Sequence, residues 1–448
     1  MTEAFLHYVW QHQMLGSGLT TTDGQPVVVL RAGELNPDAG PDFFNARVRV
    51  GKVEWAGNIE VHVRSTDWIQ HHHDVDAAYN NVVLHVVYEH DGEIRLANGK
   101  VPPTVELKHF LHPSLVANYE SLMVPDGGDR IPCSSRLNEV PEFITHSFLE
   151  RLAVERIETK ASTVRRLHEE SHGVWIQTCY WLLARYFGGK VNALPFELLA
   201  KATDQRLLAR WSNDRQRLEA LLMGQAGLLE KSFQDDYPRA LQADYEPLRS
   251  AAQLTPIDGF LWKFYRLRPT SFPTIRISQF ADLLSRIPNL FSNLLQMTDV
   301  KQLEQMFVCE AAPYWNDHYQ LDQPANDNHP KRIGRMQSDM LIINAWVPLL
   351  FVYGVELGQQ QYKDQAVSLL QQLPAENNAV IRRWQQAGVT PRNAAESQAL
   401  LQLSSHYCNT RQCLECRIGY HILSSQHRFK SDSCLTDVRL MSDKSRRK

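Results

Sequence analysis

Apolar and polar residues alternate with a period of two along residues 27–107, and turn residues separate the alternating runs. Successive side chains on a strand point to opposite faces, so this pattern predicts strands with one face against a core. The five runs are PVVVLRAG, FFNARVRVG, KVEWAGNIEVHV, NNVVLHVVYEHDG and GKVPPTVEL. An amphipathic helix is expected at residues 3–15 and a short helical turn at 76–81. These elements predict an α+β domain with a mixed or antiparallel sheet.

The pattern changes beyond this segment. Residues 123–132, MVPDGGDRIP, concentrate Pro, Gly and Asp and predict a linker. From Pro141 onward apolar residues recur at three- and four-residue spacing, which predicts helices. A polar stretch at 318–332 predicts a long loop within the helical part, and the polar tail after Gln426 is expected to be frayed. The expected domains are an α+β domain at 1–130, a helical domain at 131–330 and a helical C-terminal region at 331–448.

The composition is that of an ordinary globular protein, with 43% hydrophobic and 22% charged residues in a chain of 448. A net charge of -3 excludes a globally basic protein that coats nucleic acid, although a local basic groove stays open. The N-terminus has no signal-peptide pattern, and no stretch reaches about 18 uncharged apolar residues. We therefore expect a cytoplasmic protein with no membrane segment, and its seven cysteines are expected to be reduced.

Two acidic residues stand where neighbouring strands would bring them together. In NIEVHVR, Glu60 and His62 fall on one side of a strand, together with Arg64. The turn at residues 36–43 would place Asp42 at the start of the preceding strand, facing Glu60. Two converging carboxylates form a site of oxygen ligands that suits Mg²⁺ or Mn²⁺.

This order of residues resembles the PD-(D/E)XK phosphodiesterase superfamily, with Pro41-Asp42 at the first motif and Glu60-Val61-His62 at the second. The resemblance implies that Asp42 and Glu60 ligate a divalent cation and that Val61 offers its backbone carbonyl to it. Such a cation neutralises charge at phosphorus and activates water. His62 stands where the superfamily usually has lysine, and an imidazole acts as a base or a ligand but is not a permanent cation.

Histidines are concentrated near this motif, with ten of the 18 in the first 112 residues. In DWIQHHHDVD, His71 and His73 would share a side if the segment is extended, so we favour them over His72 as supporting residues. His85, in VVLHVV, is a third candidate. Structural interpretations also remain open: a solvated sheet face for Glu60, His62 and Arg64, a hydrogen-bonded core histidine for His85, and a turn former for Asp42.

Three cysteines lie close together near the C-terminus, as Cys408-x4-Cys413-x2-Cys416. Three thiolates are one fewer than a closed zinc or iron-sulfur site requires. Cys133 is the leading candidate for the fourth ligand, with His406 or Cys434 behind it. The arrangement resembles some PD-(D/E)XK nucleases in which one distant cysteine and a downstream triplet hold an iron-sulfur cluster. The alternative is that all are ordinary buried residues.

Two features of the helical part receive structural interpretations. Cys179 and Cys309 lie in apolar helical runs and are expected in the core. The first long helix has a basic side that could contact phosphate, but interleaved glutamates favour a salt-bridged surface. The basic residues are Arg151, Arg156, Lys160, Arg165 and Arg166.

Longer runs carry a second resemblance that spans nearly the whole chain. They are NPDAGPDFFNARV, WAGNIEVHVRSTDW, HxHDxDAAYNNVVLHVV, KVNALPFELLAK and HYCNTRQCLECRIG. Together they are similar to an uncharacterised bacterial family, domain-of-unknown-function family 2851, which implies no activity by itself.

Three functional hypotheses follow. The first is a nuclease or phosphodiesterase that depends on a divalent metal and acts on nucleic acid, with Asp42, Glu60 and His62 in the site. The second is a nuclease fold that has lost catalysis and serves as a binding or scaffolding protein. The third is a metal hydrolase of a small molecule, in which His62 and His85 bind Zn²⁺ or Mn²⁺ directly.

Overall fold

The computed structural model describes residues 1–123 and 131–425, so most of the expected linker and the tail from Gln426 lie outside it. Contacts divide the chain into two compact units. Unit 1 comprises residues 1–148 and 404–448, and unit 2 comprises residues 149–403. Unit 1 contains a sheet and unit 2 is mainly helical, which confirms the α+β prediction.

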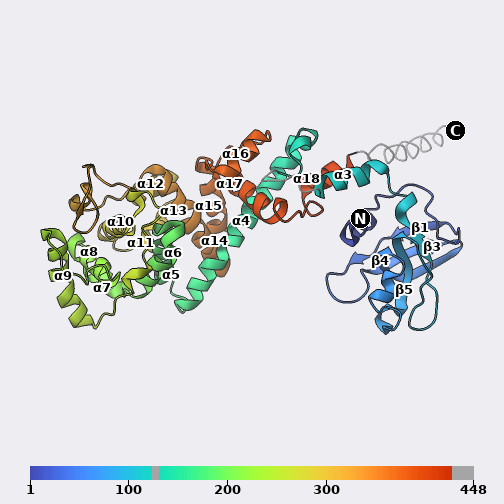
Figure 1. Cartoon of the computed structure of the whole chain (residues 1–448), viewed down its shortest axis with the longest axis horizontal. Coiled ribbons are helices and arrows are strands. Elements are labelled where there is room, and N and C mark those ends of the chain that lie inside the picture. Colours follow the sequence, from blue (N-terminus) through green and yellow to red (C-terminus); the bar gives the residue numbers. More distant parts are fainter. Residues whose placement is uncertain (124–130, 426–448) are drawn as a thin grey trace, which may run out of the picture. The chain divides into compact units, whose positions relative to one another are not determined.

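A six-stranded mixed sheet forms the centre of unit 1 (Figure 1). Its strands are β1 (Val27–Arg31), β2 (Glu34–Leu35), β3 (Phe43–Val50), β4 (Val53–Arg64), β5 (Val82–Glu89) and β6 (Thr104–Glu106). The order is β1-β3-β4-β5-β6, and β2 pairs with β3. Strands β1, β2 and β4 run antiparallel to β3, whereas β5 runs parallel to both β4 and β6. All five predicted strand runs are present.

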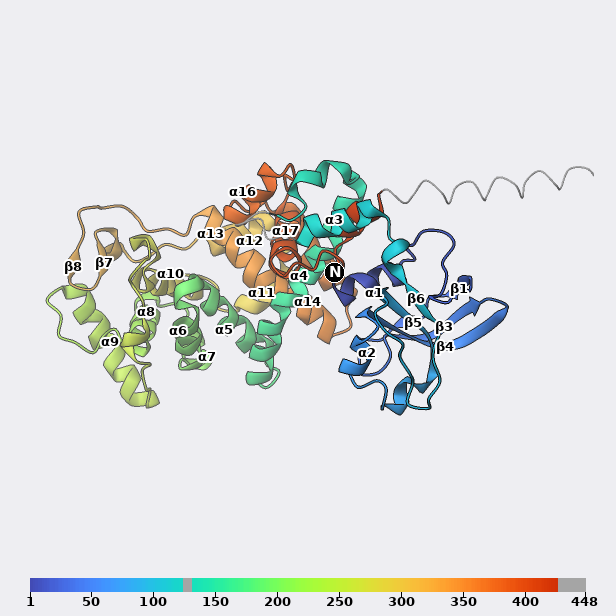
Figure 2. The same ribbon diagram turned by 45° about the vertical axis from the view of Figure 1, so that its right-hand side comes forward.

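The parallel pairing of β4 with β5 follows from the segment that joins them. A hairpin would force antiparallel strands, but residues 65–81 are long enough to cross over and return. This crossover contains α2 (Asp67–Gln70) and the 3₁₀ turn η1 (Ala77–Asn81), which matches the turn expected at 76–81. Both α1 (Glu3–Gln11) and α2 pack on β4 (Figure 2).

Unit 1 is completed by chain segments that are distant in sequence. They are η2 (Leu107–His109), α3 (Pro113–Met123), η3 (Ser134–Glu139), the π-helical turn η8 (Leu403–Cys408) and α18 (Arg417–Ser424). Helix α18 packs on α3 and η3, and Asn118 donates a hydrogen bond to the carbonyl of Ile422. The unit boundaries therefore differ from those expected at 130 and 330, because local composition does not reveal that a C-terminal segment returns to an early helix.

Unit 2 is a helical assembly entered through the long helix α4 (Glu142–Glu170), which begins in unit 1. Its next helices are α5 (Trp175–Phe187), α6 (Gly189–Lys201), α7 (Gln205–Arg210), α8 (Arg215–Gln225), α9 (Asp236–Ala252), η4 (Gly259–Leu261), η5 (Pro269–Ser271), α10 (Pro273–Arg286), α11 (Leu290–Gln296), α12 (Val300–Phe307) and η6 (Pro313–Asn316). The remaining helices are α13 (Arg335–Leu341), the π-helical turn η7 (Ile342–Trp346), α14 (Val347–Glu356), α15 (Gln360–Gln372), α16 (Ala379–Gln386) and α17 (Ala394–Gln402).

The polar stretch at 318–332 forms a small hairpin inside unit 2 and not a boundary. Its strands are β7 (His318–Gln320) and β8 (Gln323–Pro324). Lys331 is buried, and its Nζ donates to the carbonyl of Asn316 and to Asp327 at 3.0 and 3.2 Å. The loop is thus fastened to the unit by its own polar groups.

The continuous helix Arg335–Glu356 is long and apolar enough to cross a membrane by length and composition. In the structure, however, 72% of its most apolar window is buried. Because it is mostly buried within the structure, it has the character of a core helix.

The basic residues of α4 are engaged within unit 2. Arg166 pairs with Glu170 and Glu197 at 2.8 and 3.0 Å. Lys160 is not at the surface, since its Nζ donates to the side chain of Asn344 at 2.8 Å and to Gln398. Ion pairs and buried hydrogen bonds therefore account for Arg166 and Lys160 without a bound phosphate.

Glu197 is the centre of an ion-pair network and offers a test of what stabilises unit 2. Its buried carboxylate meets Arg166, Arg185 and Lys201 at 2.7 to 3.0 Å. Burial alone would raise the pKa of Glu197, but the pairs with Arg166 and Lys201 outweigh it and lower the pKa to about 2. A carboxylate with a lowered pKa stabilises the fold above its unfolded value, and this contribution is lost as the pH falls toward the folded value.

We expect Glu197→Gln to lower the free energy of unfolding by about 2 kcal/mol at pH 7, allowing for the partial exposure of its basic partners. The difference from the wild type should shrink markedly at pH 3, within the window between 4.5 and about 2. Denaturant unfolding of both full-length proteins at the two pH values measures it. Glu170→Gln, at the exposed rim of the network, is the control and should cost less than about 1 kcal/mol. Equal losses for both variants would contradict the prediction.

Candidate functional site

A buried polar cluster lies on one face of the sheet, where β4 and β5 run side by side. Glu60 pairs in register with His85, and the two residues are 4% and 0% exposed. His62, two residues further along β4, is 1% exposed. Its Nδ1 lies 3.0 Å from Nε2 of His85, a hydrogen-bond distance. Burial excludes the interpretation of Glu60 and His62 as part of a solvated sheet face.

Two further histidines reach this cluster from the crossover segment that follows α2. His71 and His73 lie in turns, not in an extended segment, and the expected basis for their common direction is therefore wrong. His72 between them has a left-handed backbone, with φ of 62°. Nε2 of His73 lies 3.2 Å from Oε1 of Glu60, and its ring stacks on Tyr79. A sharp turn of the chain thus brings His73 to Glu60 and His71 to His62 and His73.

The ring nitrogens of three histidines converge at one point. One nitrogen each from His62, His71 and His73 lies within 4.8 Å of the others, a grouping that could hold a metal ion. Among the residues that the structure describes, Nε2 of His62 has no hydrogen-bond partner. It lies 3.6 Å from Oε1 of Glu60, too far for a hydrogen bond. A buried nitrogen without a partner is costly, and a cation between these groups would satisfy it.

Asp42 lies at the edge of the cluster, directly before β3. The turn that places it is closed by Asn36, whose amide donates to the carbonyl of Asp42 at 2.8 Å. The amide of Asp42 lies 3.1 Å from Oε2 of Glu60, and its Oδ2 accepts a hydrogen bond from the amide of Val61 at 2.9 Å. Asp42 therefore meets Glu60 through its backbone amide, whereas its carboxylate holds the backbone of β4.

One member of the cluster was not expected from the sequence. His7, on α1, has its Nε2 3.2 Å from Oδ2 of Asp42. Burial alone would lower the pKa of His7, but the hydrogen bond and charge of Asp42 raise it. Burial raises the pKa of Glu3, one turn earlier on the same helix, and the charge of His71 opposes this rise. A polar face on an otherwise apolar helix is the signal in the sequence that could have indicated His7.

Burial determines the protonation of the inner residues. It lowers the pKa of His62 to about 3, and positive charge on His73 and His71 acts in the same direction. The pKa of His85 is likewise lowered by burial and by His62. Burial raises the pKa of Glu60, and the hydrogen bond from His73 opposes that rise. Neutral imidazole is the form of histidine that ligates metals, so His62 is kept in the state a metal site requires.

The donor set is richer in nitrogen than the sequence suggested. Three imidazoles with one carboxylate suit Zn²⁺ or Mn²⁺ better than Mg²⁺, which prefers oxygen ligands. His85 does not reach the point where the three histidines meet, because its Nε2 is directed to Nδ1 of His62. A hydrogen on that Nδ1 would leave Nε2 of His62 free to ligate. Among the residues described, His62, His71, His73 and Glu60 are therefore the candidate ligands, and His85 orients His62.

The predicted cysteines also come together, at a different place in unit 1. A small cavity is lined by Cys133, Cys408, Cys413 and Cys416. His406 is not among its lining residues, and Cys434 lies outside the described part of the chain. Cys179 and Cys309 are buried in unit 2, as expected for core residues.

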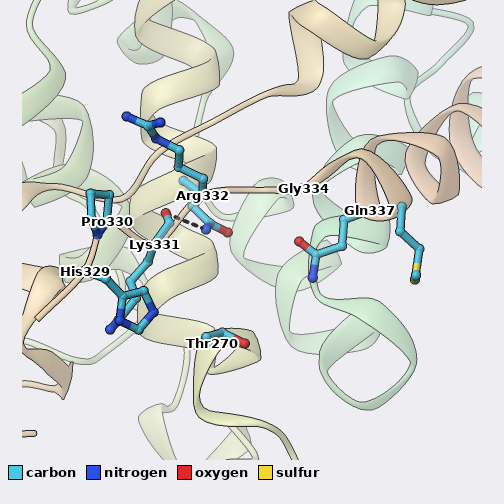
Figure 3. Close-up of a pocket in the computed structure, with 9 residues that line it drawn as sticks. Thr270, His329, Pro330, Lys331, Arg332, Gly334 and Gln337 are labelled. Atoms are coloured by element: carbon cyan, nitrogen blue, oxygen red, sulfur yellow. Dashed lines mark hydrogen bonds between the residues drawn. The ribbon is translucent and has the colours of Figure 1, made fainter. Parts of the chain in front are cut away.

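A larger pocket of about 370 Å³ in unit 2 is lined by cationic side chains (Figure 3). These side chains are paired with carboxylates of the protein. Lys331 and Arg332 extend in opposite directions along its wall. Asp327 pairs with both Lys331 and His329, at 3.2 and 3.3 Å. Arg332 pairs with Glu310 at 2.8 Å. Because carboxylates of the protein neutralise these charges, the pocket is a weaker candidate for a reactive site than the histidine cluster.

Comparison with known proteins adds a family but no activity. No curated protein and no solved structure matches the chain. A family model described as "Protein of unknown function (DUF2851)" matches residues 3–379, which include the whole histidine cluster and end before the C-terminal cysteines. Because this match covers most of the sequence, the chain belongs to the DUF2851 family.

Proposed function

We propose that the protein is a metal-dependent hydrolase of phosphodiesters, with nucleic acid as its substrate, and that it acts in the cytoplasm. The observation that carries the proposal is the buried Nε2 of His62, which has no hydrogen-bond partner among the described residues and converges with nitrogens of His71 and His73. A cation held by these three nitrogens would give this atom the partner that a buried polar group requires.

In this proposal His62, His71, His73 and Glu60 hold a Zn²⁺ or Mn²⁺ ion. When bound, the ion supplies Lewis acidity and neutralises charge on a phosphate group. Asp42 and His85 have positioning roles. Asp42 fixes β4 through the amide of Val61, and His85 fixes the ring of His62.

The phosphodiester assignment rests on the resemblance of Pro41-Asp42 and Glu60-Val61-His62 to the PD-(D/E)XK superfamily. The contact between Asp42 and Glu60 across β3 and β4 supports it, since the two motifs need to meet at one place. The carbonyl of Val61 stays an expected ligand under that resemblance. His62 differs from the usual lysine, and its position suits a ligand better than a permanent cation.

A second candidate is a hydrolase of a small molecule, which the nitrogen-rich donor set favours. Three imidazoles are a common ligand set for hydrolytic zinc, which keeps its fourth position for water, and this set does not itself select a nucleic acid. The burial of His62 and Glu60 also suits a compact substrate.

The experiment is hydrolysis by the purified full-length protein after removal of metals and reloading with Zn²⁺, Mn²⁺ or Mg²⁺. Substrates are single- and double-stranded DNA and RNA, and bis(p-nitrophenyl) phosphate as a small diester. We expect cleavage of nucleic acid with Zn²⁺ or Mn²⁺, loss with a chelator and recovery on adding metal back. Cleavage of the small diester alone would support the second candidate. Binding of nucleic acid without cleavage would instead support a scaffolding protein.

A further inference from the structure

Four cysteines from distant parts of the chain line one cavity in unit 1. Cys133 directly precedes η3, while Cys408 ends η8 and Cys416 caps α18. Cys413 lies in the turn between the last two. The other lining residues are Leu122, Pro132, Tyr407 and Gly419. The cavity therefore has four sulfur donors in otherwise largely apolar walls.

These thiols lie close enough to affect each other. Burial raises the pKa of Cys133, and Cys416 and Cys413 raise it further. Burial likewise raises the pKa of Cys408, with added effects from Cys133, Cys416 and Cys413. Cys133, Cys408 and Cys413 form no disulfide bond with one another, so a disulfide among them does not explain the cluster. Cys179 and Cys309 show the contrasting case of buried cysteines that lie in a helical core away from this group.

The turn that carries Cys413 packs closely against helix α18. A Cβ at Gly419 would lie 2.1 Å from the carbonyl oxygen of Cys413, so only glycine allows α18 to pack this tightly on the turn. Arg411 adopts a left-handed backbone, with φ of 56°, and donates to the carbonyl of Leu122 at 3.1 Å. The turn is thereby fastened to α3, and Arg411 adds positive charge beside the thiols.

We propose that Cys133, Cys408, Cys413 and Cys416 bind a metal centre through four thiolates, either a zinc ion or an iron-sulfur cluster. Four cysteine sulfurs are the ligand set of structural zinc and of iron-sulfur clusters. The centre joins the segment before η3 to the C-terminal segment, and so closes unit 1 across a long stretch of sequence. It is independent of the histidine site.

The spacing of the sulfur atoms bears on which centre is bound. A tetrahedral zinc with bonds of about 2.3 Å would hold the four sulfurs about 3.8 Å apart. Within the described residues, no three of these sulfurs lie within 4.8 Å of one another. Zinc would thus draw the side chains inward by rotation about their Cα–Cβ bonds, whereas a cluster of several iron atoms spans a wider ring of thiolates.

Metal analysis of the full-length protein, purified without oxygen or chelators, tests the proposal. His62→Ala serves as the parent so that the histidine site does not contribute. We expect either about one zinc per chain, or iron with a matching amount of acid-labile sulfide and a broad visible absorption. For zinc, replacement by Co²⁺ should give the intense sulfur-to-metal absorption of thiolate ligation. Adding Cys413→Ser should remove the metal, whereas adding Cys309→Ser should leave it in place.

The absence of stoichiometric zinc or iron in the parent protein would overturn the proposal, and this measurement does not depend on whether a variant folds. Metal that survives in the Cys413→Ser protein would overturn it as well. Co²⁺ bound without a sulfur-to-metal band would place the metal elsewhere in the chain and would also contradict the assignment.

Discussion

Replacing His62 with alanine is expected to reduce metal-dependent hydrolysis by about 100-fold or more, with a similar loss of affinity for Zn²⁺. His62 lies at the centre of the proposed site, between His85 at 3.0 Å and the nitrogens of His71 and His73. The substitution removes one ligand, so fewer groups remain to bind the cation. Isothermal titration with Zn²⁺ and cleavage assays on the same preparations measure the two effects.

The neighbouring histidine run supplies a matched control. His72→Asn removes an imidazole but keeps a residue type that tolerates the left-handed backbone, and because His72 is exposed and is not part of the converging group, affinity and rate should stay within about twofold of the wild type. His73→Ala should resemble His62→Ala, because its Nε2 lies 3.2 Å from Glu60. Circular dichroism distinguishes loss of a ligand from loss of the fold. Zinc affinity that is equal in the wild type and in folded His62→Ala would remove the basis of the proposed site.

The part of this site that lies on strands could be predicted from sequence. A period of two puts Glu60 and His62 on one side of β4, and the turn chemistry around Asn36 puts Asp42 at the start of β3. Both features depend only on local backbone geometry. The sequence could not show whether that face was solvated or covered, because the cover comes from the crossover between β4 and β5.

The remaining site residues depend on long-range packing. His7 reaches Asp42 only because α1 packs on β4, and nothing in the spacing of the two residues indicates this. An extended segment would place His71 and His73 on one side, whereas in the structure a left-handed residue at His72 produces their common direction. The same limit explains the unit boundaries, since the return of residues 404–425 to α3 is a tertiary contact. Cys133 was selected from three candidates, and only the fold brings it to the triplet.

Gly57, on β4 three residues before Glu60, leaves no room for a Cβ atom. A Cβ there would lie 2.4 Å from Cγ1 of Val83 and 2.6 Å from the carbonyl oxygen of Asn81. Both belong to the start of β5 or to the turn before it, and the pairing of β4 with β5 is irregular just beyond, between Asn58 and Ile59. Glycine at this point therefore permits the close parallel contact that aligns Glu60 with His85.

Gly57→Ala is accordingly expected to destabilise the pairing of β4 with β5 by about 2 kcal/mol, because backbone atoms of the crossover must shift to admit the methyl group. Hydrogen exchange read by mass spectrometry over residues 53–64 and 82–89 measures this locally, as faster exchange than in the wild type. Gly92→Ala is the control: its Cβ would meet only the methyl group of Thr66, at 3.2 Å, which can yield. Unchanged exchange in Gly57→Ala would show that the methyl group does not destabilise the pairing of β4 with β5 and would contradict the prediction. Faster exchange together with weaker Zn²⁺ binding would link the strand register directly to the alignment of His62 with His85.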